Sequence, residues 1–342
     1  MKLIDLRSDT VTRPSQEMLA VMMNADVGDD VYGEDMTVIE LETMLADRAG
    51  MEAAVFAPSG TQSNLMALMA HCERGDEYIV GQTAHTFMWE GGGAAVLGSI
   101  QPQPLDFAPD GSLPLEKVAL AIKPIDSHHP RTKLLCLENT TAGKVLPLSY
   151  LREMKIFCQE NELHSHLDGA RVFNAAVKLG VHLEEISNHF DSISICLSKG
   201  LGAPIGSVLC GSEELIKKAR RWRKVLGGGM RQAGILAAAG IYALQHHVER
   251  LREDHENADF FARALAECDE IEVDLAALQT NIFFIQVKGD YSELRAYLCE
   301  RGVLFAKQPN KAGKVRCVTH LNVSREDLVQ VIRHIKSFYA GR

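Results

Sequence analysis

Short apolar runs alternate with longer amphipathic stretches from about residue 50 to residue 210. This alternation is typical of strand–helix–strand units, which build a mostly parallel sheet covered by helices. Helical spacing is found at 61–71, 115–122 and 149–161. The apolar runs predict strands at Ala53–Ala57, Tyr78–Val80, Ala94–Leu97, Lys133–Leu137, His164–Leu167, Ser192–Leu197 and Ser207–Cys210. We therefore expect a large α/β domain over residues 15–250.

The pattern changes in the last quarter of the chain. Residues 212–267 have helical periodicity throughout except at the glycine triplet 227–229, so we expect a long helix that links two domains. The order strand, helix, strand, strand, helix then follows, at 281–287, 291–300, 303–306, 315–320 and 325–339. This order predicts a smaller α+β domain over residues 251–342.

Charge and cysteine usage exclude several classes of function. The chain has 36 basic and 45 acidic residues, and its only basic cluster is short (217–224), which argues against nucleic acid as a partner. Its longest apolar stretch, 233–244, is shorter than the roughly 20 residues that span a bilayer. The first residues of the chain show no signal-peptide pattern. The 8 cysteines form no C-x-x-C pair, which is typical of reduced thiols in the cytoplasm. Small molecules are the expected partners.

A lysine follows the predicted strand at 192–197, in Ser198-Lys199-Gly200. Ligands bind at the C-terminal edge of an α/β sheet, where a partly desolvated lysine can lose its proton and form a Schiff base with a carbonyl. Taken alone, Lys199 is more simply interpreted as an ordinary surface lysine. Its interpretation therefore depends on the residues that share the sheet edge.

A carboxylate, Asp168, follows the predicted strand at 164–167 and is expected at the same edge. Such a carboxylate can keep a pyridine nitrogen protonated, as pyridoxal phosphate requires when it acts as an electron sink. The alternative is that Asp168 caps a helix that begins near Arg171. The two interpretations are equally supported by this segment alone.

The turn Ser59-Gly60-Thr61 joins a predicted strand directly to an apolar helix. Free N–H groups at a helix start bind anions, Gly60 allows close approach, and the two hydroxyls can add hydrogen bonds. The turn lacks the lysine of a Walker motif and the spacing of a dinucleotide fingerprint, so it suits a single phosphate. An ordinary helix cap is the alternative.

Two histidines and two arginines complete the set of candidates. His85 lies near the sheet edge, where it could stack on a planar ring or move protons, and His128 precedes the strand at 133–137. Arg171 and Arg316 could bind a substrate carboxylate bidentately, one from each domain, or form surface ion pairs. Structural histidines remain the alternative for His85 and His128.

Together these segments resemble the low-specificity threonine aldolases, pyridoxal-phosphate lyases of the aspartate-aminotransferase fold (fold type I). The resemblance covers nearly the whole chain and includes relatives that act on L-allo-threonine. The matching segments are Asp5–Thr12, Val27–Gly33, Ser59–Thr61, Leu167–Arg171, Leu197–Gly200 and Gly227–Gln232. The resemblance implies cleavage of L-threonine or L-allo-threonine to glycine and acetaldehyde, pyridoxal 5'-phosphate as cofactor, and a homotetramer whose subunits share active sites.

The resemblance also implies individual roles. Lys199 would be the Schiff-base lysine, Asp168 the partner of the ring nitrogen, and His85 the residue stacked on the ring. Residues 1–14 would contribute to the site. The cofactor would be held further by Ser59, Gly60, Thr61, Arg171 and Ser198, with Arg231 and Lys224 from a neighbouring subunit. The substrate would be bound by Ser8, Tyr32, Arg171 and Arg316.

Two departures from the family pattern stand near the site. Thr141-Ala142 replaces a His-Asn pair, and Trp89 stands where relatives often have another aromatic residue. The mechanism also needs a base for the β-hydroxyl proton. Because ring stacking would occupy His85, we favour His128, or a water that it orients, as this base.

Three other functions fit parts of the sequence. His164, His166 and Asp168 alternate along one strand and could ligate a metal in a hydrolase or lyase, although no second cluster completes the site. The same cofactor anchors would serve an aminotransferase or a β-eliminating lyase. A non-catalytic protein could also retain the fold.

Overall fold

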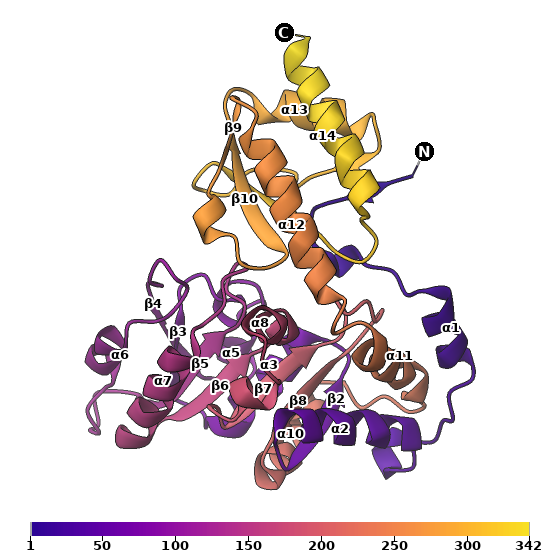
Figure 1. Ribbon diagram of the computed structural model, residues 1–342. Coiled ribbons are helices and arrows are strands. Elements are labelled where there is room, and N and C mark those ends of the chain that lie inside the picture. The colour runs from indigo at the N-terminus through magenta and orange to yellow at the C-terminus, as the bar shows by residue number, and fades with distance from the viewer. Residues whose placement is uncertain (1, 342) are drawn as a thin grey trace.

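The computed structural model describes residues 2–341, which form a large domain around a central sheet and a small domain stacked on it (Figure 1). The central sheet has seven strands in the order β2-β8-β7-β6-β5-β3-β4, and only β8 runs antiparallel to its neighbours. The strands are β2 (Ala53–Ala57), β3 (Asp76–Gly81), β4 (Gln101–Leu105), β5 (Arg131–Glu138), β6 (His164–Asp168), β7 (Ser192–Cys196) and β8 (Ser207–Gly211). The predicted α/β fold with a mostly parallel sheet is confirmed.

Helices cover the sheet, and one of them, α3 (Gly60–His71), leads directly from β2 and packs across β6, β7 and β8. Its N-cap is Ser59, whose hydroxyl accepts a hydrogen bond from the backbone N–H of Gln62. Residues 63–69 of this helix are buried, so it lies inside the domain. The other helices of the large domain are α1 (Gln16–Met23), α2 (Met36–Ala49), α4 (His85–Met88), α5 (Gly93–Val96), α6 (Leu115–Ala121), α7 (Leu148–Glu160), α8 (Val172–Leu179), α9 (Glu184–Ser187), α10 (Glu213–Val225) and α11 (Gly234–His246).

Two predictions about this domain were wrong. Residues 94–97 belong to the short helix α5, and the strand lies further on, at β4. Pro102 and Pro104 argued against a strand here, because proline lacks the N–H that a central strand must donate. Strand β4 lies at the edge of the sheet, where proline is tolerated. The predicted linking helix is three helices, because a second break at 247–250 separates α11 from α12 (Leu251–Ala266).

The small domain is built on an antiparallel sheet of β9 (Ile271–Val273), β10 (Ile282–Val287) and β12 (Lys314–Val318). Helices α12, α13 (Tyr291–Cys299) and α14 (Arg325–Ala340) pack with it around Phe261, whose ring meets that of Phe283 edge to face. Strand β9 was not predicted, and the strand expected at 303–306 is only β11 (Val303–Leu304). No helix within residues 2–341 is both long and apolar enough to cross a membrane.

The beginning of the chain returns to this small domain. Strand β1 (Ile4–Asp5) pairs in parallel with β11, and Leu6 is fully buried in the small core. The next residues form a 3₁₀ turn (Asp9–Val11) that reaches the edge of the large sheet, where Thr12 Oγ1 donates to the carbonyl of Lys199 at 2.8 Å. This N-terminal segment therefore contacts both domains.

Candidate active site

The predicted site residues gather at the C-terminal edge of the central sheet. Glu138 and Asp168 end the paired strands β5 and β6, and Lys199 follows β7. His85 begins α4 just after β3, and its ring nitrogen lies within 4.8 Å of the Asp168 carboxylate. Since parallel strands end at one edge, the fold brings together residues that are far apart in the sequence.

Asp168 is buried and its carboxylate is held from two sides. Oδ1 accepts the backbone N–H of Ala170 at 3.1 Å, and Oδ2 accepts Asn64 Nδ2 at 3.0 Å. The same Nδ2 donates to Glu90 Oε1 at 2.9 Å. The bond from Ala170 is a local turn and not a helix cap, because α8 begins at Val172 with Arg171 as its N-cap and has no side-chain cap bond. The capping interpretation of Asp168 was therefore wrong.

His85 lies at the solvent-exposed side of the site. Its side chain is 41% exposed, and its Nδ1 lies 2.9 Å from Oε1 of Glu90, which is only 4% exposed. The hydrogen bond to Glu90 raises the pKa of His85, and burial raises the pKa of Glu90. Both shifts favour a proton held by the pair beside Asp168.

Glu138 was not predicted as a site residue. Its Oε2 accepts the backbone N–H of His85 at 2.8 Å, which fixes the start of α4 against the end of β5. Burial raises the pKa of Glu138 to about 7, and the charge of Asp168 adds to this shift. The available signal was a carboxylate at the end of an apolar strand.

Lys199 is half-buried, and its ammonium group makes no hydrogen bond or ion pair within residues 2–341. Its backbone is fixed by the bond from Thr12. Its positive charge lowers the pKa of Asp9 and of Glu138, which places the amine among the carboxylates of the site. The amine is thus positioned and unpaired.

The turn before α3 has free backbone donors. The Ser59 hydroxyl accepts from Gln62, while the N–H groups of Gly60 and Thr61 have no hydrogen-bond partner within the described part of the chain. A Cβ at position 60 would lie 2.7 Å from Cys196 Sγ. The structure therefore requires a glycine for packing against the end of β7, in addition to any close approach of an anion.

We expect Gly60→Ala to displace this turn, because the new methyl group cannot fit beside Cys196. The expected loss is about 1–3 kcal/mol of unfolding free energy from overpacking, together with weaker binding of the cofactor that the resemblance implies. Denaturant unfolding and a cofactor titration measure the two effects. The double variant Gly60→Ala, Cys196→Ala is the control, and stability that does not recover in it would contradict the packing explanation.

Arg171 and Asp9 form a bidentate ion pair. Nε donates to Asp9 Oδ2 at 2.8 Å and Nη2 to Oδ1 at 2.6 Å. Burial alone would raise the pKa of Asp9, but the Arg171 guanidinium outweighs it and holds this pKa well below its usual value. Nε and one N–H of Nη2 are occupied, whereas Nη1 has no partner within residues 2–341, so the contact between Arg171 and a substrate carboxylate stays a prediction.

Arg316 has guanidinium donors without a side-chain partner within residues 2–341. Its Nη2 donates to the carbonyl of Arg7 at 3.1 Å, and burial together with the neighbouring Arg171 charge lowers its pKa. Ser8, which caps the 3₁₀ turn, is buried in the same segment. The small domain, the N-terminal segment and the sheet edge therefore meet here.

A second group of predicted residues lies apart from this edge. Tyr32 and Lys224 line a cavity of about 460 Å³ between the 3₁₀ turn Asp30–Tyr32 and α10. Arg231 pairs with Asp29 at 2.9 Å and lies over the ring of Tyr32. No residue of the Lys199 cluster lines this cavity. Tyr32 and Lys224 therefore line a cavity separate from the Lys199 cluster, and the roles of these residues and of Arg231 stay predictions.

His128 lies at the opposite edge of the sheet. It is exposed in the loop before β5, whereas the other candidates follow the C-terminal ends of their strands. Its backbone N–H donates to Asp126 at 2.8 Å, and no side-chain contact joins it to the site. A role for His128 as the base would require a second copy of the chain to deliver it.

The loop that departs from the family pattern follows Glu138. Thr141 Oγ1 donates to the Glu138 carbonyl at 2.8 Å, and Ala142 has a φ of 51°. This is the left-handed region, which side chains with a Cβ disfavour. The substituted pair therefore forms a local turn beside the end of β5.

We expect Ala142→Gly to leave stability unchanged or to raise it by up to about 1 kcal/mol, because glycine adopts positive φ without steric cost. Ala20→Gly is the matched control. Since Ala20 is exposed inside α1, this change should destabilise the protein by about 0.5–1 kcal/mol. Denaturant unfolding measures both, and equal losses in the two variants would contradict the expectation.

The metal alternative finds no support in the arrangement of its residues. Both ring nitrogens of His166 are engaged, Nδ1 with Ser192 Oγ at 2.8 Å and Nε2 with Asn64 Oδ1 at 3.2 Å. His164 is exposed beside Asp191. Within residues 2–341, the one group with ligand spacing is His85, Glu90 and Asp168. Of these three, His85 and Asp168 are residues that the predicted cofactor would contact.

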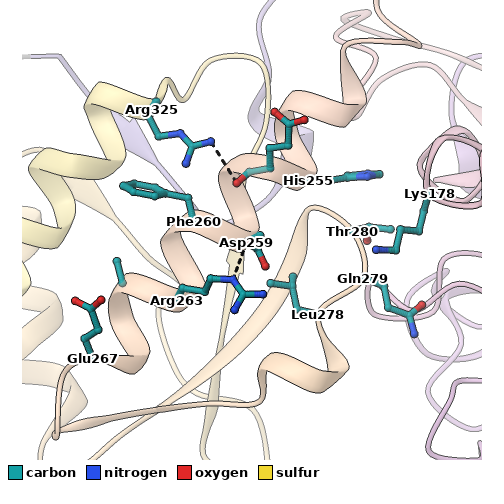
Figure 2. Close-up of a pocket in the computed structure, with 12 residues that line it drawn as sticks. Lys178, His255, Asp259, Phe260, Arg263, Glu267, Leu278, Gln279, Thr280 and Arg325 are labelled. Atoms are coloured by element: carbon teal, nitrogen blue, oxygen red, sulfur yellow. Dashed lines mark hydrogen bonds and ion pairs between the residues drawn. The ribbon is translucent and has the colours of Figure 1, made fainter.

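A wide groove of about 650 Å³ lies between α8 and α12, away from these residues (Figure 2). Lys178 projects from the large domain toward Thr280 and Gln279, and the other wall carries the pair Arg263–Asp259. His255 Nε2 lies 3.0 Å from Asn174 Oδ1, and this contact joins α12 to α8 beside the groove. The groove holds none of the predicted site residues.

Comparisons with known proteins identify the family of this chain. Residues 5–288 match the family model "Beta-eliminating lyase". The chain is 57% identical over 339 residues to the low specificity L-threonine aldolase of Escherichia coli K12, which covers 99% of this chain and 100% of the relative. It is 43% identical to a probable low-specificity L-threonine aldolase 2 of Arabidopsis thaliana, covering 97% and 96% of the two chains.

Solved structures show the same fold. The threonine aldolase of Leishmania major superposes with a TM-score of 0.83 at 21% identity, over 98% of this chain and 99% of that one. A putative L-allo-threonine aldolase of Listeria monocytogenes has a TM-score of 0.78 at 22% identity, covering 94% and 93%. From its match to the family model and its full-length identity to these relatives, the chain belongs to the low-specificity L-threonine aldolases of the beta-eliminating lyase family.

Proposed function

We propose that this protein is a pyridoxal-phosphate-dependent aldehyde-lyase that cleaves L-threonine and L-allo-threonine to glycine and acetaldehyde, reversibly, and accepts other β-hydroxy-α-amino acids. The observation that carries the proposal is the meeting of Lys199, Asp168 and the turn before α3 at one sheet edge. The full-length identity to the low specificity L-threonine aldolase of E. coli supports the choice of reaction.

The residues at the edge fit pyridoxal phosphate. The unpaired amine of Lys199 suits its aldehyde, the buried Asp168 carboxylate suits a protonated ring nitrogen, and His85 suits the ring face. Free N–H groups at the start of a helix suit its phosphate. When bound, the cofactor supplies a conjugated ring that accepts the electrons released as the Cα–Cβ bond breaks. The proposed phosphate ligands are Ser59, Gly60, Thr61 and Ser198, with Lys224 and Arg231 from a second copy.

Arg316 and Ser8 are proposed to hold the substrate carboxylate. Arg316 keeps donors that no other side chain occupies, and a guanidinium binds a carboxylate in a fixed orientation. Arg171 is proposed to act through Asp9, by fixing the N-terminal segment that carries Ser8. A carboxylate held at Arg316 would orient the substrate between the two domains.

The β-hydroxyl must lose its proton when the bond breaks. Within one chain, His85 is the histidine at the site, and Glu90 holds its Nδ1. His128 could accept the proton only from a second copy, which is the arrangement that a homotetramer with shared sites would provide. Tyr32 would reach the substrate in the same way. We therefore propose a cytoplasmic homotetramer in which neighbouring subunits complete each site.

The visible spectrum before and after borohydride reduction, followed by mapping of the modified lysine, tests the cofactor. We expect a yellow protein that borohydride bleaches and that then carries the phosphopyridoxyl group on Lys199. Assays with L-threonine, L-allo-threonine and glycine plus acetaldehyde test the reaction. Transamination or β-elimination without glycine release would point to another enzyme of the same fold. A colourless protein that takes up no pyridoxal phosphate would overturn the proposal.

A further inference from the structure

A buried chain of hydrogen bonds leads away from Asp168 through the interior of the large domain. Asn64 contacts Asp168 at one end of its amide and His166 at the other. His166 contacts Ser192, whose Oγ lies 2.7 Å from His71 Nε2. Asn64, His166 and Ser192 are at most 2% exposed. None of these four residues has a role in the function proposed above.

The positions of these residues follow from two regular spacings. Asn64 and His71 are seven residues apart on α3, so they lie on the same face of that helix. His166 and Asp168 are two residues apart on β6, so they point to the same face of the sheet. Ser192 pairs with His166 across β6 and β7. The chain of contacts is therefore built into the packing of α3 on the sheet.

The chemistry of the groups sets the direction of every bond. The Asp168 carboxylate can only accept, so the Asn64 NH₂ faces it and the Asn64 carbonyl must accept from His166 Nε2–H. His166 Nδ1 then accepts from the Ser192 hydroxyl, which in turn accepts from His71 Nε2–H. Burial lowers the pKa of His166 to about 4 and keeps His71 well below its usual pKa. Both rings are therefore neutral, as this order requires.

We propose that Asn64, His166 and Ser192 are positioning residues that hold Asp168 as an ionised acceptor facing the cofactor ring. Every donor in the chain points toward the carboxylate, and hydrogen bonds in series polarise one another in a buried setting. Without the Asn64 amide, Asp168 and Glu90 would face each other with no bridging donor. This inference rests on the proposed function, because it assigns these residues to the binding of pyridoxal phosphate.

The first test uses the protein without cofactor and needs no activity. Selective ¹⁵N labelling of histidine reports which ring nitrogen carries the proton. We expect His166 to be neutral with its proton on Nε2 throughout pH 6–8. A proton on Nδ1, or a doubly protonated ring at pH 6, would overturn the directed chain. Ser192→Ala should weaken this preference, since it removes the donor to Nδ1 while the Asn64 carbonyl still accepts from Nε2–H.

The second test compares Asn64→Ala with Ser63→Ala. Ser63 is also buried on α3 and accepts from Ser194 Oγ at 2.7 Å, but it does not touch Asp168. We expect Asn64→Ala to weaken pyridoxal-phosphate binding about tenfold or more, the loss of a bond to a charged group. Its kcat should fall while KM is unchanged, and the visible spectrum of the bound cofactor should shift. Ser63→Ala should bind the cofactor as the wild type does.

The outcomes separate the two proposals. Equal cofactor affinity and equal spectra in Asn64→Ala and Ser63→Ala would overturn the positioning role. A wild-type protein that binds no pyridoxal phosphate would overturn the proposed function itself. If Asn64→Ala does not fold, Ser192→Ala replaces it, because every group that contacts Asp168 remains. This variant should bind the cofactor about threefold more weakly, as expected for a weakened neutral hydrogen bond, and wild-type affinity would contradict the chain.

Discussion

Lys199→Ala should lower kcat by about 10⁴-fold or more, as expected when the residue that forms a covalent bond to the cofactor is removed. Its effect on folding should be small, within about 1 kcal/mol, because the ammonium group makes no bond whose partner would be left unsatisfied. The measurement is steady-state cleavage of L-threonine and L-allo-threonine at saturating cofactor, with unfolding followed in parallel.

Lys178→Ala is the matched control for this variant. Lys178 is exposed on α8 and lines the groove in Figure 2, and it belongs to none of the proposed binding sites. Its activity should equal that of the wild type. Cleavage by Lys199→Ala at more than about a hundredth of the wild-type rate, with the cofactor bound, would contradict the proposed covalent role.

Asp9→Ala should lower the free energy of unfolding by about 3–5 kcal/mol. The Asp9 side chain is fully buried and that of Arg171 is 13% exposed, so the variant leaves a guanidinium charge without its partner. The N-terminal segment should also lose its fixed position against the large domain. The KM for amino acid substrates should therefore rise. Denaturant unfolding at pH 7 measures the first effect and steady-state kinetics the second.

The exposed pair Asp259–Arg263 provides the control. These side chains are 49% and 65% exposed, so Asp259→Ala should cost less than about 1 kcal/mol. If Asp9→Ala and Asp259→Ala lower the free energy of unfolding equally, the Arg171 charge has found another partner. The structural role assigned to Asp9 would then be wrong.

Acid should erase the difference between the wild type and Asp9→Ala. The folded pKa of Asp9 lies below its unfolded value of about 3.9, so its contribution is complete above that value. It is lost as the pH falls through the lower, folded pKa. The difference in unfolding free energy should therefore be constant from pH 8 to about pH 5 and should shrink below about pH 4.

The sequence predicted that Lys199, Asp168 and His85 lie at one edge of the sheet, and the structure has them there. Lys199, Asp168 and His85 could be placed because strands of a parallel sheet end at one edge, whatever lies between them. Glu90, Asn64 and Glu138 were missed because their contacts join residues such as Asn64 and Asp168, which are 104 positions apart. No local pattern encodes such a pair. The partner of Arg171 was missed for the same reason, since Asp9 is 162 positions away.

Helix α12 illustrates a different limit. Apolar periodicity runs through 247–250, but the chain breaks there and His247 Nδ1 turns to the Leu201 carbonyl at 2.6 Å. A helix with continuous spacing and two helices in the same phase look alike in the sequence. In the small domain, β9 was missed because its three residues are too few to show the alternation typical of a strand.

The pairing of β1 with β11 has a consequence for biosynthesis. Ile4 is synthesised 299 residues before its partner Val303. At about 5–20 residues per second, the first strand waits roughly 15–60 s for the rest of its sheet. The large domain, whose strands end at Gly211, can fold during this interval. Synthesis therefore favours a nascent chain in which Lys199 is already in place while Ser8 and Arg316 are brought together last.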